Sequence, residues 1–142
     1  MAGSIIALDV GSVRIGVAAC EHPDLPAMPL TTLAHESRAK DIAAVVALAQ
    51  ERGANTIVVG YPLRLDGSRG PAAEQMDRFI EALRAAYTGD VIAMDERLTT
   101  AAAHAKLRDS GMSAGKRRKV VDRLAAVEIL ESYRARLRRG EA

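Results

Sequence analysis

The chain has 142 residues, of which 49% are hydrophobic and 27% charged, a composition typical of a single globular domain spanning residues 1–142. Its single cysteine, Cys20, excludes an intrachain disulfide and a cysteine-rich zinc site, and its few aromatic residues argue against base stacking on aromatic platforms. No apolar stretch approaches the ~20 residues of a membrane span and no charged leader precedes a signal-type segment, so we expect a cytoplasmic protein without a membrane partner.

The net charge of +2 conceals a strong asymmetry along the chain. Residues 1–96 carry 8 Lys/Arg and 13 Asp/Glu, whereas residues 97–140 carry 12 Lys/Arg and 4 Asp/Glu. An acidic part followed by a basic part suggests a polyanion that is held by one region and processed beside the other. A solvated basic helix is the alternative explanation of the same pattern.

The beginning of the chain predicts three strands. Residues 4–10 and 14–20 are apolar runs rich in β-branched residues, and the short segment between them contains Gly11, so they read as a hairpin. A connection punctuated by three prolines then leads to a short strand over residues 30–33.

Two helices alternate with two further strands in the middle of the chain. Ser37 is suited to cap the first helix and Gly53 to end it, while Pro71 suits the first turn of the second helix. The β-branched and apolar content of the two strands indicates that they are buried, and they span residues 56–60 and 91–94.

The remainder predicts two helices, one from Thr99 or Thr100 to about Ser110 and one from about Val120 to Arg139. Residues 111–119 are small and basic, and we expect a mobile connection there. The complete order is β-β-β-α-β-α-β-α-α, which predicts an α/β fold with a five-stranded mixed sheet and helices packed on its faces.

Three acidic positions are unusual for a soluble domain. Asp9 lies inside the first apolar strand, Asp95 and Glu96 end the last strand, and Asp122 lies on the apolar side of the final helix, one turn before Ala126. A carboxylate among apolar residues loses hydration unless a cation or hydrogen bonds compensate. One such acid is often satisfied by an arginine or a backbone donor, but three that converge would repel one another. They therefore predict a divalent-metal site.

The ligand chemistry points to one reaction class. Carboxylate oxygens select Mg²⁺ or Mn²⁺ over Zn²⁺. Two such ions about 4 Å apart can clamp the attacking and leaving oxygens of an in-line phosphoryl displacement. With water as the nucleophile, the natural reaction is phosphodiester hydrolysis.

Four motifs, in the same order along the chain, resemble those of one family. They are Leu8-Asp9-Val10-Gly11 with Arg14-Ile15-Gly16-Val17-Ala18, Val59-Gly60-Tyr61-Pro62-Leu63 with Asp66-Gly67-Ser68, Asp95-Glu96-Arg97-Leu98-Thr99-Thr100, and Val121-Asp122 with Ala125-Ala126 and Ile129-Leu130. The chain resembles the YqgF family of pre-16S rRNA nucleases, also called RuvX. That family is similar to Holliday-junction resolvases of the RNase H-like superfamily, so the resemblance implies an RNase H-like fold.

The resemblance also assigns roles to the acidic residues. It implies that Asp9, Glu96 and Asp122 are the catalytic acids and ligands of the metal ions, and that Asp95 is an auxiliary carboxylate. Two ions, Mg²⁺ or Mn²⁺, are the expected cofactors.

Several basic residues are candidates for contact with nucleic acid. The resemblance places Arg14 and Arg97 near the scissile phosphate and the loop Tyr61–Gly70, which contains Arg64 and Arg69, beside the active site. A basic cluster precedes and enters the last helix, where backbone phosphates would bind and affinity would fall steeply with salt. Its members are Lys116, Arg117, Arg118, Lys119 and Arg123.

The leading interpretation is a metal-dependent endonuclease of structured nucleic acid. The resemblance favours 5′-end processing of pre-16S rRNA, with ribosomal precursor particles as partners. Resolution of four-way DNA junctions fits the same chemistry and would call for a homodimer whose paired sites nick opposing strands. A non-catalytic nucleic-acid-binding factor of ribosome assembly is the alternative from another class, and a phosphotransfer enzyme acting on small nucleotides is a weaker one.

Overall fold

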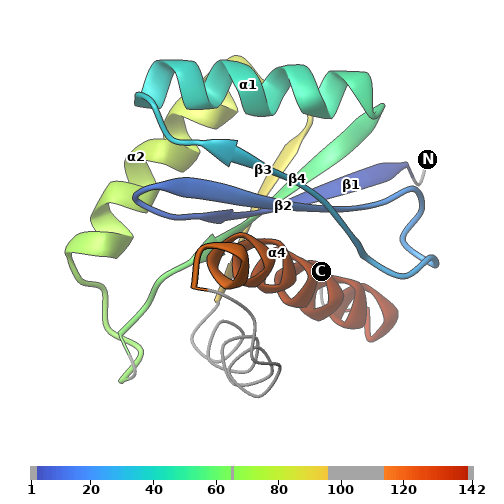
Figure 1. Cartoon of the computed structure of the whole chain (residues 1–142). Helices are drawn as coiled ribbons and strands as arrows, with labels where there is room; N and C mark the ends of the chain where they lie inside the picture. The colour runs from blue at the N-terminus through green and yellow to red at the C-terminus, as the bar shows by residue number, and fades with distance from the viewer. Residues whose placement is uncertain (1–2, 65, 96–113, 141–142) are drawn as a thin grey trace.

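A computed structural model describes residues 3–64, 66–95 and 114–140 of the chain, with side chains described up to Asp95 and again from Arg123 (Figure 1). Within these ranges no helix has the length and apolarity required to cross a bilayer. The elements are β1 (Ser4–Val10), β2 (Arg14–Cys20), β3 (Met28–Ala34), α1 (Arg38–Glu51), β4 (Ala54–Tyr61), α2 (Pro71–Ala86), β5 (Asp90–Asp95) and α4 (Ala114–Arg138).

The five strands form one mixed sheet in the order β3-β2-β1-β4-β5. Strand β2 runs antiparallel to both β1 and β3, whereas β1, β4 and β5 run parallel to one another. The predicted five-stranded mixed sheet is therefore confirmed. Because β1 is central and parallel to β4 and β5, the carboxyl ends of these three strands meet at one edge of the sheet, where sites of α/β proteins collect.

Helices cover both faces of the sheet. Helices α1 and α2 lie on one face and α4 lies on the other (Figure 1). Alternation along β1 divides its residues accordingly, since Ile6 and Leu8 belong to the core beneath α1 and α2, while Ile5 and Ala7 belong to the core beneath α4. This division decides on which face each side chain of the candidate site lies.

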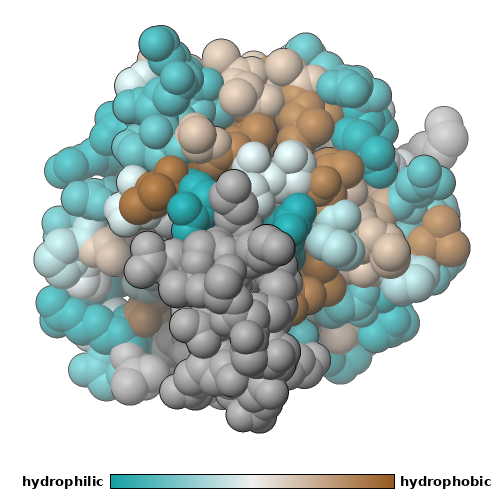
Figure 2. All heavy atoms as spheres, viewed as in Figure 1, coloured by the Kyte–Doolittle hydropathy of each residue, from teal (hydrophilic) through white to brown (hydrophobic). Residues whose placement is uncertain are grey.

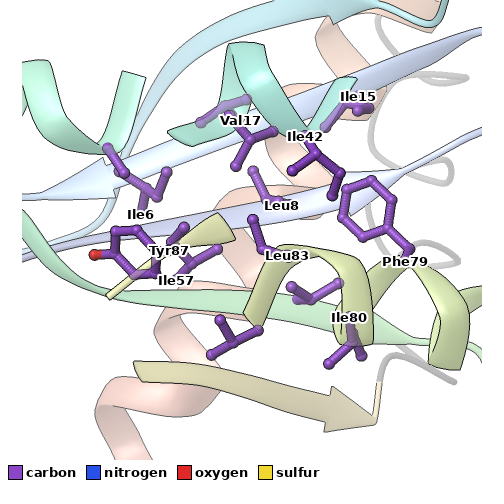
Figure 3. Packing of buried hydrophobic residues seen from close by; sticks show 14 of the residues in the cluster. Ile6, Leu8, Ile15, Val17, Ile42, Ile57, Phe79, Ile80, Leu83 and Tyr87 are labelled. Atoms are coloured by element: carbon purple, nitrogen blue, oxygen red, sulfur yellow. The ribbon is translucent and has the colours of Figure 1, made fainter. Parts of the chain in front are cut away.

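The larger core brings together residues that are distant in sequence. Ile42 of α1 and Phe79 of α2 point toward one another over Leu8 of β1 (Figure 3). Burying aliphatic and aromatic side chains of this size contributes about 1.5–3 kcal/mol each. On the outside, hydrophilic residues occupy much of the rim of the face seen in Figure 2.

The predicted helix ends agree with the structure at three positions. The Oγ atom of Ser37 accepts a hydrogen bond of 3.2 Å from the backbone N–H of Lys40, which caps α1. Gly53 has φ +66°, a left-handed conformation that glycine adopts without strain just after a helix. Pro71 is the first residue of α2, where its missing N–H costs nothing.

The last helix differs from its predicted extent. Helix α4 begins at Ala114 and not near Val120, so the expectation of a mobile connection is wrong from Ala114 onward. The physical reason is that Lys and Arg have long unbranched side chains with high helix propensity, so a run of them is compatible with a helix. The helix predicted from Thr99 or Thr100 to Ser110 lies outside the described residues.

The carboxylate of Asp41 is buried in the first turn of α1, with 4% of its side chain exposed. Its Oδ2 lies 2.5 Å from Nδ1 of His35, and its Oδ1 accepts a 3.0 Å hydrogen bond from the backbone N–H of Glu36. We expect Asp41→Ala to lower the free energy of unfolding by about 2 kcal/mol, because two charge-assisted hydrogen bonds to a buried carboxylate are lost and the backbone N–H of Glu36 loses its acceptor. Urea unfolding measures this loss, and Glu51→Ala, at the exposed end of α1, is the control. Equal losses in both variants would contradict the assignment.

Candidate active site

Asp9 lies at the carboxyl end of the central strand and is half-buried. It alternates with Ala7, so its side chain belongs to the face of the sheet that α4 covers. The residue opposite Asp9 on β2 is Gly16. Because glycine has no side chain, β2 contributes none beside the Asp9 carboxylate at this position.

Arg14 lies on the same face as Asp9. It is half-buried at the start of β2, and it alternates with Gly16 and with Ala18, which packs beneath α4. In the register of the two strands Arg14 is the diagonal neighbour of Asp9, a separation that long side chains can span. The register therefore allows the Arg14 guanidinium to reach the candidate catalytic acid.

Asp95 lies on the opposite face of the sheet. It ends β5, and it is exposed. Met94 packs in the core beneath α4 and Val91 packs in the core beneath α1 and α2, so alternation assigns Asp95 to the same face as Val91. The carboxylate expected to be auxiliary thus shares the sheet edge with Asp9 but not its face.

The other predicted catalytic residues are described only in part. Asp122 belongs to α4, which packs on the face of Asp9, and it precedes the buried residues Ala125 and Ala126 by about one turn. Glu96 and Arg97 lie outside the described residues, as does the side chain of Asp122. Among the side chains that are described, no group of three potential ligands forms a metal site. Convergence of the three acids therefore stays a prediction.

The basic residues predicted to bind nucleic acid lie in two places. Arg64 and Arg69 are exposed in the segment between β4 and α2, and Arg123 is half-buried on α4. The remaining four cations belong to the first two turns of α4, and their side chains are outside the described residues. These four are Lys116, Arg117, Arg118 and Lys119.

The segment between β4 and α2 is held against α2 by a network that the sequence did not reveal. The hydroxyl of Tyr61 donates a 2.6 Å hydrogen bond to Oδ1 of Asp77, and the guanidinium of Arg69 forms an ion pair with Oδ2 of the same carboxylate. Arg69 also donates through Nε to the Tyr61 hydroxyl at 3.2 Å. Arg69, predicted to contact nucleic acid, thus also fixes the loop, and Asp77 is half-buried.

The same network shifts the acidity of its members. The hydrogen bond from Tyr61 is the main cause that lowers the pKa of Asp77 from its usual 3.8, and the same bond raises the pKa of Tyr61 above 10.0. In Tyr61→Phe we expect the pKa of Asp77 to rise toward its usual value, as measured by an NMR pH titration of its carboxyl carbon. Since the folded-state pKa is lowered, this contribution to stability is present above pH 3.8 and is lost as the pH falls through the folded-state value.

Glu74→Gln is the matched control for this titration, because Glu74 is an exposed acid on the same helix. It should leave the pKa of Asp77 where it is in the wild type. A Tyr61→Phe protein with an unchanged Asp77 pKa would show that the hydroxyl does not hold the carboxylate.

Comparisons with known proteins show the family and the fold of the chain. The family profile described as "RuvX: Holliday junction resolvase" matches residues 3–136. A protein of Syntrophus aciditrophicus is 46% identical over 91% of this chain and 86% of its own length, and one of Clostridium perfringens is 38% identical over 94% and 97%. Both carry the name "Putative pre-16S rRNA nuclease".

Two solved structures resemble the fold. RuvC of Thermus thermophilus, in complex with a Holliday junction substrate, matches with a TM-score of 0.65 at 14% identity, covering 98% of both chains. The Fowlpox virus resolvase, in complex with Holliday junction DNA, matches with a TM-score of 0.58 at 10% identity, covering 94% of this chain and 98% of its own. These likenesses confirm the predicted RNase H-like fold. Since the profile spans nearly the whole chain and the relatives are 38–46% identical over most of its length, the chain belongs to the RuvX family.

Proposed function

We propose that this protein is a divalent-metal-dependent endonuclease that hydrolyses phosphodiester bonds in structured nucleic acid, and that it processes the 5′ end of pre-16S rRNA. The observation that carries the proposal is the half-buried carboxylate of Asp9 at the carboxyl end of the central strand, on the face covered by the helix that contains Asp122. Membership of a family whose relatives carry nuclease names supports it.

The donor chemistry around Asp9 fits Mg²⁺ or Mn²⁺. Asp9, Glu96 and Asp122 offer only carboxylate oxygens, which are hard ligands, and the one cysteine, Cys20, is buried inside the core beneath α4. Gly16, opposite Asp9 on β2, adds no side chain that would compete with a cation for the Asp9 carboxylate. When bound, two such ions lower the pKa of the attacking water and neutralise charge on the phosphate.

The carboxylates and the arginines would have different roles in the reaction. Asp9, Glu96 and Asp122 hold the ions and orient the attacking water toward the phosphorus. Arg14 lies on the face of Asp9 and, together with Arg97, offsets negative charge that develops on the phosphate oxygens.

The substrate is proposed from the relatives. The names of the relatives point to pre-16S rRNA and thus to ribosomal precursor particles as partners. The description of the family profile favours a second candidate, resolution of four-way DNA junctions, for which the protein would act as a homodimer.

A direct comparison of the two substrates tests the proposal. The purified protein is incubated with an end-labelled pre-16S rRNA fragment and with a labelled four-way junction, each in Mg²⁺, in Mn²⁺ and in EDTA. We expect metal-dependent cuts at the 5′ side of the mature rRNA end and little cleavage of the junction. Symmetrical nicks in the junction alone would favour the resolvase. Salt-sensitive binding of both substrates without cleavage would indicate a non-catalytic assembly factor.

A further inference from the structure

A cavity of about 620 Å³ lies on the face of the sheet opposite Asp9, at the same edge. The turn that follows β1, the start of α1 and the first half of α2 form most of its wall, and these lie near one another in Figure 1. His35, before α1, and Pro62, after β4, complete it. We propose that this cavity binds one unpaired nucleotide of the substrate strand next to the cleavage site. The inference rests on the proposed function, because it assumes that nucleic acid passes Asp9.

The turn that lines one side of the cavity directly follows Asp9 in the chain. Its lining residues are Val10, Gly11 and Ser12. Consecutive Cα atoms are about 3.8 Å apart, so a strand whose phosphate lies at Asp9 has its neighbouring nucleotide within reach of this turn. A Cβ on Gly11 would lie 2.8 Å from the carbonyl oxygen of Arg14, so the tight turn between the two sites requires glycine.

Two guanidinium groups at the cavity are available to an anion. Arg38 of α1 and Arg78 of α2 both line it, and both are exposed. Among the residues that the structure describes, neither arginine has an acidic or hydrogen-bonding partner for its side chain. Guanidinium is the side chain best suited to hold a phosphate through paired N–H donors.

The one acid in the wall does not oppose this binding. Asp41 lines the cavity, but its carboxylate is buried against the His35 ring and the backbone N–H of Glu36. Its oxygens are thus occupied within the protein, and the two arginines remain the charges that a ligand meets. The cavity therefore favours an anionic group.

The remaining lining suits a nucleobase. Met76 and Phe79 of α2 provide an apolar wall, while Gln75 and the hydroxyl of Ser12 provide hydrogen-bonding groups of both kinds. A base is a flat apolar body with a polar edge, and the cavity volume lies within the range of roughly 300–1,000 Å³ that is typical of small-molecule sites. A paired base is stacked and its edge is occupied, so the nucleotide that enters must be unpaired.

Binding without cleavage tests the inference. Fluorescence anisotropy in EDTA compares a labelled RNA hairpin that has a single-stranded tail with the same hairpin made blunt. Two variants alter the cavity, Arg38→Ala/Arg78→Ala by charge and Ala72→Phe by filling it from an exposed position on α2. We expect each to weaken binding of the tailed hairpin by about tenfold or more, and to change binding of the blunt one by less than about twofold.

The control variant Lys40→Ala/Arg52→Ala removes the same charge from α1 and its C-cap, outside this cavity, and it should change neither affinity by more than about twofold. Unchanged affinity for the tailed hairpin in both cavity variants, or an equal loss for both hairpins, would overturn the inference. A free nucleoside monophosphate serves as a competitor. If the monophosphate binds more tightly than the tailed hairpin does, the cavity is a site for a free nucleotide. The proposal that it binds a nucleotide of the substrate strand is then excluded.

The outcomes separate this inference from the proposed function. A protein that holds the tailed hairpin through the cavity but cuts no substrate in Mg²⁺ contradicts only the nuclease. Suppose instead that the wild type cuts in Mg²⁺, and that the cavity variants bind each hairpin with the wild-type affinity. This result contradicts only the nucleotide site.

Discussion

Asp9→Asn should lower the rate of metal-dependent cleavage by at least about 10³-fold, or about 4 kcal/mol of transition-state stabilisation. The substitution keeps the size of the side chain and removes the negative charge that holds the cation. Asp9 is half-buried in the central strand, on the face that α4 covers, so the substitution acts at the candidate site itself. Single-turnover cleavage of the pre-16S rRNA fragment measures the effect.

Asp24→Asn is the control for this substitution. Its carboxylate is 85% exposed and, among the described residues, pairs only with His22 at 3.5 Å, so the same chemical change there should leave cleavage unaltered. Circular dichroism of the Asp9→Asn protein should match that of the wild type. A folded Asp9→Asn protein that cuts at the wild-type rate would refute the assignment of Asp9.

The second large effect is the dependence of binding on salt. If the five cations at the start of α4 contact phosphates, the logarithm of affinity for duplex should fall with the logarithm of salt concentration with a slope of about −4.5. Between 50 and 200 mM salt the affinity would then fall about 500-fold. Replacing the residues 116–119 by alanine should reduce the magnitude of the slope by about 3.6. Filter binding over a salt series in EDTA measures both quantities.

The opposite end of the same helix provides the control for the salt series. Arg138→Ala/Arg139→Ala removes exposed cations from the end of α4, and the slope should stay unchanged. An unchanged slope after replacement of residues 116–119 would show that phosphates are held elsewhere on the protein.

The sheet could be predicted from local patterns because each of its strands carries a clear signal. The β-branched run of β4 and the apolar run of β1 mark buried strands, and the turn at Gly11 marks the hairpin. Ser37 and Gly53 likewise mark the two ends of α1 through their effects on neighbouring residues. Such signals depend only on neighbouring residues, so they can be recognised without the tertiary structure.

The start of α4 could not be predicted from the same kind of pattern. Residues 114–119 lack an apolar stripe, so hydrophobic periodicity gives no helix signal there. By that criterion the basic run 116–119 resembles a connection between helices. The high helix propensity of Lys and Arg is compatible with a helix through these residues but does not mark where it begins.

The candidate site was predictable only where one residue conflicts with its own surroundings. Asp9 stands out because a carboxylate in an apolar strand is costly whatever lies around it. Asp77 and Asp41 gave no such signal, since each lies on a helix with polar neighbours. Their partners, Tyr61 and His35, lie 16 and 6 residues away and come into contact only through the fold.

The central claim is that three acids distant in sequence meet around divalent ions, and iron-mediated cleavage of the protein backbone tests it most directly. Fe²⁺ loaded in place of Mg²⁺ generates hydroxyl radicals with ascorbate and peroxide, which cut the chain beside the bound metal. The account predicts cuts near Asp9, Glu96 and Asp122 in the same protein, suppressed by excess Mg²⁺ and lost in Asp9→Asn. Cuts near only one of the three positions, or cuts that Asp9→Asn leaves unchanged, would contradict it.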